Sequence, residues 1–287
     1  MTKTPIIGLV KYSCRSYFGK NDIFKQPKYM DYRLDIFKNI TLKSFQEQTD
    51  KDFNVFLLHS ENLPQNYKDI FTEFENNNSF LYNVYIPDSK LRGKDFLNSK
   101  DFVNAVESSV EYVNFINGVS INFRIDNDDA LPCNFISRLK NFLKPDFYDY
   151  AISFPYVSII QRTKKNMYLK QEKYFPANSI GLAYVTDNNN YKTIMTLGNH
   201  GRINEKRPMI LLHGSGGIQT INGKNIMNSL YLGHVSSFDE DRLRSFLKEK
   251  GYSDFDFKCL NIFKRRLIFD TIIKTKNFIK KNRVPKE

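Results

Sequence analysis

Short apolar runs alternate with amphipathic segments through the first 160 residues, and this pattern constrains the fold more than any other feature. The spacing predicts strands at 5–14, 52–58, 80–86, 119–125 and 150–160, separated by helices at 31–48, 64–74, 101–115 and 131–142. Strands that alternate with helices at these distances are typical of βα units. We therefore expect an α/β fold whose mostly parallel sheet is covered by helices on both faces.

The second half follows a looser pattern. Residues 168–186 are typical of a hairpin, Asn188–Asn190 of a turn, and 208–212 of a short strand. Ser237 and Glu240 have the spacing of a capping box, which predicts a helix running to about Lys250. A final basic helix is expected from about Phe257. No linker interrupts the chain, so we expect one catalytic domain over 1–235 and a helical extension over 236–287 packed on it.

The net charge of +12 is concentrated at the end of the chain, where residues 258–287 contain ten basic and two acidic side chains. Such a tail indicates an anionic surface, either lipid head groups or nucleic acid. A solvated charged helix packed on the domain is the alternative. The three cysteines are scattered, and neither a signal peptide nor a run of about 18 apolar residues occurs. We expect a reduced, cytoplasmic protein that contacts the inner face of the membrane peripherally through the tail.

The stretch Val119–Leu131 reads V-S-I-N-F-R-I-D-N-D-D-A-L and carries the clearest chemistry. An alternating strand runs directly into Asp126, Asp128 and Asp129, so three carboxylates lie at its carboxyl end. Like charges placed so closely need a positive partner, and a hard divalent cation with oxygen ligands is one. Ligands of open α/β sheets bind at this edge. The alternative is an acidic surface turn.

A second candidate is His213, which follows the 208–212 strand and precedes Gly214, Gly216 and Gly217. Its imidazole could complete a metal shell, and the glycines would let a phosphate approach the backbone. A structural turn is the alternative reading. Basic side chains at other strand ends and loops would suit a diphosphate, namely Lys11, Arg15, Arg92 and Lys94, although each could be a plain surface charge. Arg124 lies two residues before Asp126 on the same strand face, and it could orient that carboxylate, contact a phosphate or form a buried ion pair.

Several other site types are excluded by their motifs. The chain contains no G-x-S-x-G nucleophile elbow, no G-x-x-x-x-G-K-[ST] loop and no G-x-G-x-x-G after the first strand. An α/β-hydrolase, a P-loop enzyme and a dinucleotide-binding Rossmann site are therefore not expected.

The chain resembles GT-A glycosyltransferases and, more narrowly, the bacterial rhamnosyltransferase family over roughly residues 5–235. The similar segments are Arg33 with Ile40–Phe53, R-I-D-N-D-D-A-L at Arg124–Leu131, and His213-Gly214. The chain departs from the family pattern at Lys11, where an arginine is expected, and lacks the tryptophan often found before the later histidine.

The resemblance implies a GT-A-like, Rossmann-type sheet and a nucleotide-sugar donor held through Mn²⁺ or Mg²⁺. Asp126, Asp128 and His213 would hold the metal. The nucleotide sugar would contact Lys11, Tyr12, Arg33, His59, Arg92, Arg124 and Asp126. Asp129 and Glu205 are the candidate catalytic carboxylates, with Asp187 as another candidate base. Inversion and retention both stay open.

We therefore expect a metal-dependent glycosyltransferase that acts on a glycan or lipid-linked acceptor in surface polysaccharide synthesis. A metal and cations would stabilise the charge that grows on the leaving diphosphate. Two alternatives remain: a nucleic-acid or anionic-membrane binder that uses the basic tail, and a metal-dependent phosphohydrolase or nucleotidyltransferase.

Overall fold

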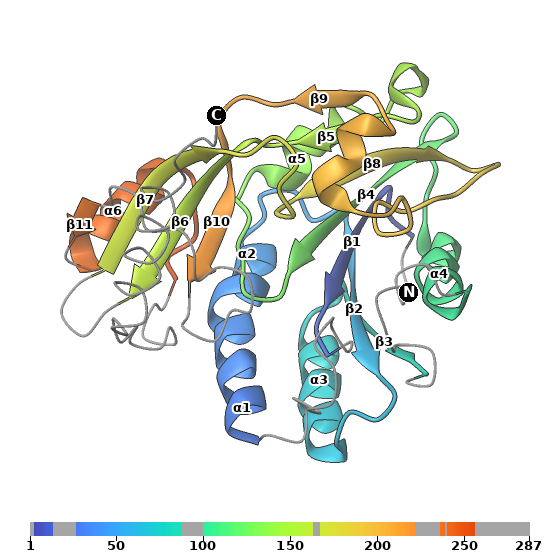
Figure 1. The fold of residues 1–287 in the computed structure, drawn as a ribbon. Helices are drawn as coiled ribbons and strands as arrows, with labels where there is room; N and C mark the ends of the chain where they lie inside the picture. The colour runs from blue at the N-terminus through green and yellow to red at the C-terminus, as the bar shows by residue number, and fades with distance from the viewer. Residues whose placement is uncertain are drawn as a thin grey trace, which may run out of the picture.

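The central sheet of the computed structural model is mostly parallel, as the sequence predicts (Figure 1). The structure describes residues 3–13, 27–87, 100–162, 167–221, 236–238 and 240–255. Among these, seven strands form the sheet in the order β3-β2-β1-β4-β8-β5-β9. Their bounds are β1 Ile6–Lys11, β2 Asn54–Ser60, β3 Leu81–Ile86, β4 Val119–Asp126, β5 Ala151–Ser153, β8 Leu182–Asp187 and β9 Met209–Leu211.

One strand of this sheet runs against the others. β1, β2, β3 and β4 pair in parallel, whereas β8 is antiparallel to both β4 and β5, and β9 is parallel to β5. The carboxyl ends of all strands except β8 therefore lie at one edge. The amino end of β8 reaches the same edge, because Leu182 lies opposite Arg124.

Two layers of apolar side chains cover the sheet, because successive residues of a strand point to opposite faces. Ile6 and Val10 of β1 belong to one core cluster, and Ile7 and Leu9 belong to the other. The first face packs against α1 (Pro27–Ile36), η2 (Phe37–Leu42), α2 (Lys43–Gln46), α3 (Gln65–Asn77) and α5 (Phe135–Lys140). The second packs against α4 (Lys100–Glu107), η5 (Ser108–Tyr112) and η7 (His200–Glu205). A short turn, η6 (Pro145–Phe147), precedes β5.

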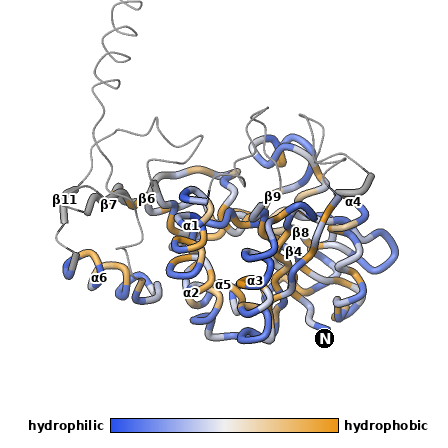
Figure 2. The backbone as a smooth tube through the Cα atoms, turned by 90° about the horizontal axis from the view of Figure 1, so that it is seen from below, coloured by the Kyte–Doolittle hydropathy of each residue, from blue (hydrophilic) through white to orange (hydrophobic). Residues whose placement is uncertain are grey.

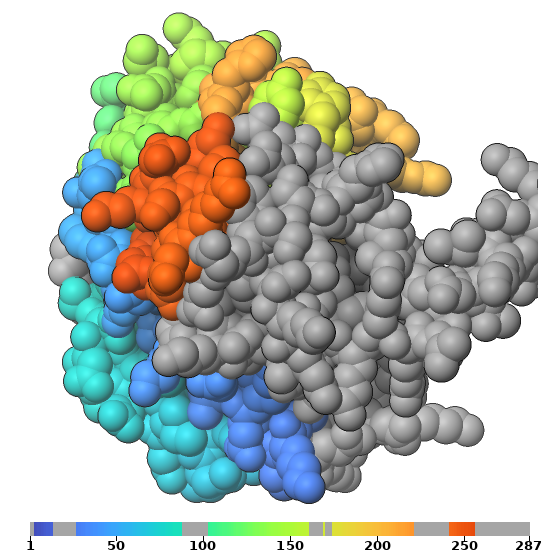
Figure 3. All heavy atoms as spheres, turned by 90° about the vertical axis from the view of Figure 1, so that its left-hand side faces the viewer, coloured from blue at the N-terminus to red at the C-terminus, as the bar shows by residue number. Residues whose placement is uncertain are grey.

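A second sheet in the order β10-β6-β7-β11 lies beside the first (Figure 1). Its strands are β6 Tyr156–Arg162, β7 Met167–Tyr174, β10 Ser215–Ile221 and β11 Ser236–Phe238. The helix α6 (Glu240–Glu249) buries Leu243 and Leu247 against this sheet and against Ile36 and Ile40 of α1 and η2. Figure 2 shows apolar and polar residues alternating along α6, and in Figure 3 its orange-red atoms meet the blue atoms of the N-terminal helices.

Two predicted elements are wrong because their halves join different sheets. The expected strand over 150–160 breaks at Phe154 and Pro155, and β5 and β6 on either side belong to separate sheets. Proline lacks the N–H that a continuous ladder needs. The expected hairpin over 168–186 is also absent, since β7 pairs with β6 and β8 pairs with β4 and β5. Neither pairing is visible in local periodicity.

Smaller differences occur at element ends. The helix expected over 131–142 is shorter, at Phe135–Lys140, and the helix expected over 31–48 begins at Pro27 and includes a π-helical segment. Ser237 lies in β11, so it does not cap α6. The basic loop 90–94 and the final basic helix fall outside the described residues.

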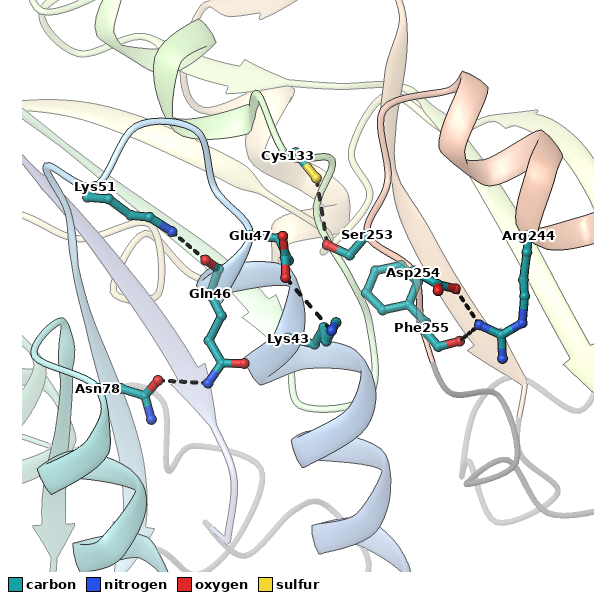
Figure 4. A network of polar contacts seen from close by, with 10 residues as sticks. All are labelled: Lys43, Gln46, Glu47, Lys51, Asn78, Cys133, Arg244, Ser253, Asp254 and Phe255. Atoms are coloured by element: carbon teal, nitrogen blue, oxygen red, sulfur yellow. Dashed lines mark hydrogen bonds and ion pairs between the residues drawn. The ribbon is translucent and has the colours of Figure 1, made fainter.

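The segment after α6 returns to the central domain. Arg244 pairs with Asp254, and its Nη1 donates to the carbonyl of Phe255 at 2.6 Å (Figure 4). Ser253 lies 3.6 Å from Cys133 Sγ, and the Cys133 amide donates to the carbonyl of Gly251. These contacts attach α6 to the start of α5. None of the helices that the structure describes is both long enough and apolar enough to cross a bilayer.

Candidate functional site

Asp126 lies at the carboxyl edge of the sheet, surrounded by positive and polar groups. The parallel register places Lys11 opposite Asp126. Arg124 Nη2 donates to its Oδ1 at 3.2 Å, and Ser179 Oγ donates to its Oδ2 at 3.1 Å. The carboxylate keeps 40% of its side-chain surface exposed. Asp126 is therefore fixed from two sides and still open to a ligand.

The neighbours of Asp126 favour its charged form. Burial by itself would raise its pKa, but Arg124, Lys11, His200 and the Ser179 hydrogen bond together lower it below the ordinary value. The group is thus an anion at neutral pH, available to a cation or a hydroxyl donor.

Asp128 lies beside this site and is paired with a helix residue. Arg33, at the end of α1, donates from Nη1 to Asp128 Oδ2 at 2.7 Å, and both side chains are largely buried. Burial would lower the pKa of Arg33, but the charge of Asp128 raises it overall. The pair holds the acidic loop against α1, and Arg33 is therefore a partner of the loop as well as a neighbour of the site.

Asp129 lies beneath the surface. It is 2% exposed, and its Oδ1 accepts a hydrogen bond from the Thr220 amide at 3.3 Å. Burial and the charges of Asp128 and Asp126 raise its pKa well above the ordinary value. Thr220 Oγ1 also donates to the carbonyl of Asp128 at 2.6 Å. Asp129 is thus bound to β10 inside the protein.

The acidic loop has its own cations. The sequence predicts a metal because three neighbouring carboxylates need positive charge, but Arg33, Arg124 and Lys11 already supply it. Within the described ranges, no group of three or more histidine, cysteine, aspartate or glutamate side chains is arranged to hold a metal ion. A cage built from protein ligands alone does not fit these residues. A hard ion held by Asp126 and by substrate phosphates does, because Mg²⁺ needs only one or two carboxylates in such sites.

His213 is not brought to the acidic loop. It is exposed just beyond β9, which lies three strands from β4 in the sheet, or about 14 Å at ordinary strand spacing. The strand order thus does not place His213 beside Asp126 and Asp128, where its predicted role as a metal ligand would need it.

Two of the glycines after His213 are required by close packing. A Cβ on Gly216 would lie 2.3 Å from the carbonyl oxygen of Phe154, and one on Gly217 would lie 2.3 Å from Ile180. Both residues belong to β10, which passes closely over these neighbours.

Two predicted nucleotide-sugar contacts are core residues. His59 is fully buried, with Nδ1 3.2 Å from Ser13 Oγ and Nε2 3.1 Å from Asn83 Oδ1. Burial lowers the pKa of His59 to about 3, so its imidazole is neutral. Tyr12 packs its ring edge-on against Phe71 at 4.5 Å and is 8% exposed. The structure assigns both side chains to the core that supports the site.

The remaining predicted residues lie farther away or outside the described chain. Glu205 is exposed at the far end of η7, five residues after His200. Asp187 lies opposite Val119 at the other end of β4, so it is at the wrong edge to act as a base beside Asp126. Arg92, Arg15 and Lys94 lie outside the described residues.

His200 and Ser179 are site residues that the sequence reading missed. Arg124 Nη1 lies 3.3 Å from Nδ1 of His200, and because arginine only donates, Nδ1 accepts. Burial, followed by Arg124, lowers the pKa of His200 to about 4, so a neutral imidazole faces the cluster with its proton on Nε2. Neither residue follows a predicted strand. The only local signal is the Asn199-His200-Gly201 sequence, in which Asn199 caps η7.

Comparison with known proteins identifies a family. A model of the family described as "Putative rhamnosyl transferase" matches residues 8–231, which is most of the chain. No curated protein matches the sequence.

Solved structures with a partly similar arrangement share little sequence with this chain. A crystal structure of S. aureus TarS 1-349 has 11% identity and a TM-score of 0.41, over 77% of this chain and 60% of that one. The same protein in complex with UDP has 10% identity and a TM-score of 0.43, over 77% and 61%. The inositol-1-phosphate CTP transferase from T. maritima has 12% identity and a TM-score of 0.32, over 77% and 90%. The chain thus spans less than two thirds of the TarS chains it matches.

Proposed function

Since this chain belongs to the rhamnosyl transferase family, we propose that it transfers a sugar from a nucleotide-sugar donor to a hydroxyl of a glycan or lipid-linked acceptor. The observation that carries the proposal is Asp126, an ionised and partly exposed carboxylate at the carboxyl edge of the parallel strands, held between Arg124, Lys11 and Ser179. Open α/β sheets bind their ligands at this edge.

The donor would lie with its diphosphate beside this group. Breaking the bond between sugar and phosphate leaves negative charge on the diphosphate, and cations already fixed in place stabilise that charge without rearranging. Lys11 and Arg124 are the described basic residues next to Asp126. Arg124 is held by His200 on one side and by Asp126 on the other, so its guanidinium is pre-oriented.

A divalent cation fits this proposal at Asp126 and is not needed to balance the loop. When bound, Mn²⁺ or Mg²⁺ would supply further charge stabilisation to the leaving diphosphate. Asp126 would hold it together with donor oxygens. Asp128 and Asp129 would keep the loop in shape through Arg33 and Thr220.

The identity of the transferred sugar is part of the proposal. The family description suggests a deoxyhexose such as rhamnose, and surface polysaccharide is the product class that we propose. A thermal-shift screen of sugar nucleotides with and without Mn²⁺ would rank the donors, and the donor that raises the melting temperature most would enter the kinetic experiment.

The test is turnover of that donor by the Asp126→Asn variant. We expect its donor hydrolysis and transfer to fall about 100-fold or more, which is the size of effect seen when a charge-stabilising group is removed. Asp187→Asn is the matched control, because this aspartate lies at the opposite edge of the sheet, and it should keep wild-type rates.

Wild-type activity in Asp126→Asn would refute the proposed site. Release of phosphate or pyrophosphate in place of sugar and nucleoside diphosphate would identify a phosphohydrolase or nucleotidyltransferase. Chelation with EDTA, followed by Mn²⁺, tests the metal separately.

A further inference from the structure

Three ring side chains, two of them exposed, form a cluster at the carboxyl edge of the central sheet. Tyr156 begins β6 and lies opposite Tyr174, the last residue of β7, with their ring centres 5.4 Å apart. The imidazole of His213 lies nearly parallel to the Tyr156 ring, at 6.4 Å. Tyr174 is 53% exposed and His213 is also exposed, whereas Tyr156 is half-buried. We call Tyr156, Tyr174 and His213 the aromatic shelf.

The shelf is held rigidly from behind. The Phe175 amide donates to the carbonyl of Pro155 at 2.7 Å, which fixes the end of β7 against the start of β6. Arg138 donates to the backbone carbonyls of His213 and Ser215 and lies 4.4 Å over the buried ring of Phe154. The backbone that carries the rings is thus fixed. Tyr174 and His213 stay exposed, although burial of their rings would have stabilised the folded protein.

The shelf lies at the same edge of the molecule as Asp126. Tyr156 follows β5, and His213 follows β9, and both strands end at that edge. β5 is two strands from β4, or about 10 Å at ordinary strand spacing, and the shelf begins three residues after the end of β5. The turn after Phe175 leads directly to Ser179, whose hydroxyl binds Asp126. A chain molecule whose end reaches Asp126 can therefore lie across the shelf.

We propose that the aromatic shelf binds the carbohydrate part of the acceptor. This proposal rests on the proposed function, since an acceptor is needed only if the chain transfers a sugar. The C–H groups on one face of a sugar ring carry partial positive charge and pack on the negative face of an aromatic ring. The phenol hydroxyls and the imidazole supply donors and acceptors for sugar hydroxyls. Apolar contact combined with a few polar groups is typical of small-ligand sites.

Another protein is a poorer match for this surface. A stable protein interface buries about 800 Å² on each side and is built around side chains that become fully enclosed. Three ring side chains at the ends of these strands offer much less area than that.

The experiment compares donor hydrolysis with transfer in Tyr174→Ala. The acceptor probes are the methyl glycosides of glucose, galactose, N-acetylglucosamine and rhamnose, and the measured quantities are the KM for the best probe, the KM for the donor and the rate of donor hydrolysis in water. We expect the acceptor KM of Tyr174→Ala to rise about tenfold while donor KM and hydrolysis stay at wild-type values. Tyr174→Phe keeps the ring and should stay within about twofold of wild type.

Tyr148→Ala is the matched control, because Tyr148 is 38% exposed and lies near the carboxyl end of β8, away from the edge that carries Asp126. It should leave every constant unchanged. Three results would overturn the proposal: an unchanged acceptor KM in Tyr174→Ala, a raised donor KM in place of a raised acceptor KM, or no binding of any probe to the wild-type protein in saturation-transfer NMR. Absence of donor hydrolysis in the wild-type protein would instead contradict the proposed function.

Discussion

At the scale of single residues, the ion pair between Arg33 and Asp128 determines how the acidic loop is held. The two residues lie 95 positions apart and are both largely shielded from water. Each of these buried charges needs the other, because removing one residue would leave the opposite charge buried without a partner. Asp128 is therefore first a structural residue, and Asp126 is the carboxylate of the loop that stays most exposed.

The buried ion pair predicts how Asp128→Asn and Arg33→Met change the stability of the protein. Each single change should lower the free energy of unfolding by about 3 kcal/mol, because it leaves the other partner buried and unpaired. The double variant should lose less than the sum of the two. Urea denaturation measures all three. Lys43→Met tests an exposed pair with Glu47 on the same helical segment and should cost less than about 0.5 kcal/mol. Additive effects of the two site changes would contradict the pairing.

A second residue-scale prediction concerns His59 and pH. Its pKa is about 3 in the folded protein and about 6.5 when unfolded, so the unfolded chain binds an extra proton between these values. Its contribution to stability is complete above pH 6.5 and is lost as the pH falls, by about 1.4 kcal/mol per pH unit. His59→Gln should show a shallower decline in the free energy of unfolding between pH 6 and pH 4. Parallel curves for the two proteins would show that His59 does not contribute in this way.

Sequence reasoning found the charged residues of the site more easily than their partners. Asp126 and Lys11 could be predicted because both follow apolar strands, and parallel strands end at one edge. The contacts of Asp128 with Arg33 and of Asp129 with Thr220 could not, since they join residues more than 90 positions apart. His59 was misassigned for the same reason, as only the packed core shows that both its nitrogens already have partners.

At the scale of elements, periodicity predicted the strands and helices of the first half and failed where a strand changes sheets. β5 and β6 look like one apolar run, but the chain turns at Phe154 and Pro155 from one sheet to the other. That turn is possible because β10 approaches it closely at Gly216, where any side chain would meet the Phe154 carbonyl. The requirement for glycine comes from a strand about 60 positions away and leaves no local pattern.

The close approach predicts that Gly216→Ala is destabilising. A Cβ placed 2.3 Å from a backbone oxygen forces β10 to move, and overpacking of this kind typically costs about 1–3 kcal/mol. Gly201→Ala is the control, since its Cβ would come no closer than 3.4 Å to a neighbour. Guanidinium denaturation of both variants is the measurement. Equal stability of the two would mean that β10 does not pack as described.

At the scale of the whole molecule, the N-terminal helices that cover the central sheet, the second sheet and α6 share a core. Ile36 and Ile40 from the N-terminal helices, Ile160 and Ile218 from the second sheet, and Leu247 from α6 lie in one buried cluster. A cluster that takes side chains from all three parts couples their stability. The two sheets should therefore unfold together.

Leu247→Ala tests this coupling. Removing a fully enclosed leucine side chain should lower the free energy of unfolding by about 2–5 kcal/mol and shift the far-UV and tyrosine near-UV transitions equally. Lys248→Ala, an exposed neighbour on the same helix, should change stability by less than about 0.5 kcal/mol. Two separate transitions in the leucine variant would show that the second sheet and α6 unfold as an independent unit.

The hydrogen bonds of Thr220 also have a consequence for biosynthesis. The loop at Asp128 contacts Arg33, which lies 95 residues earlier in the chain and is synthesised before it. The loop also contacts Thr220, which lies 92 residues later and is synthesised after it. A nascent chain that has emerged from the ribosome only as far as β8 already contains every strand beside Asp126 but lacks the backbone that holds Asp128 and Asp129 from the other side. The site is therefore finished only when translation has passed β10, and a chain truncated before that point would carry the acidic residues without the support that fixes their positions.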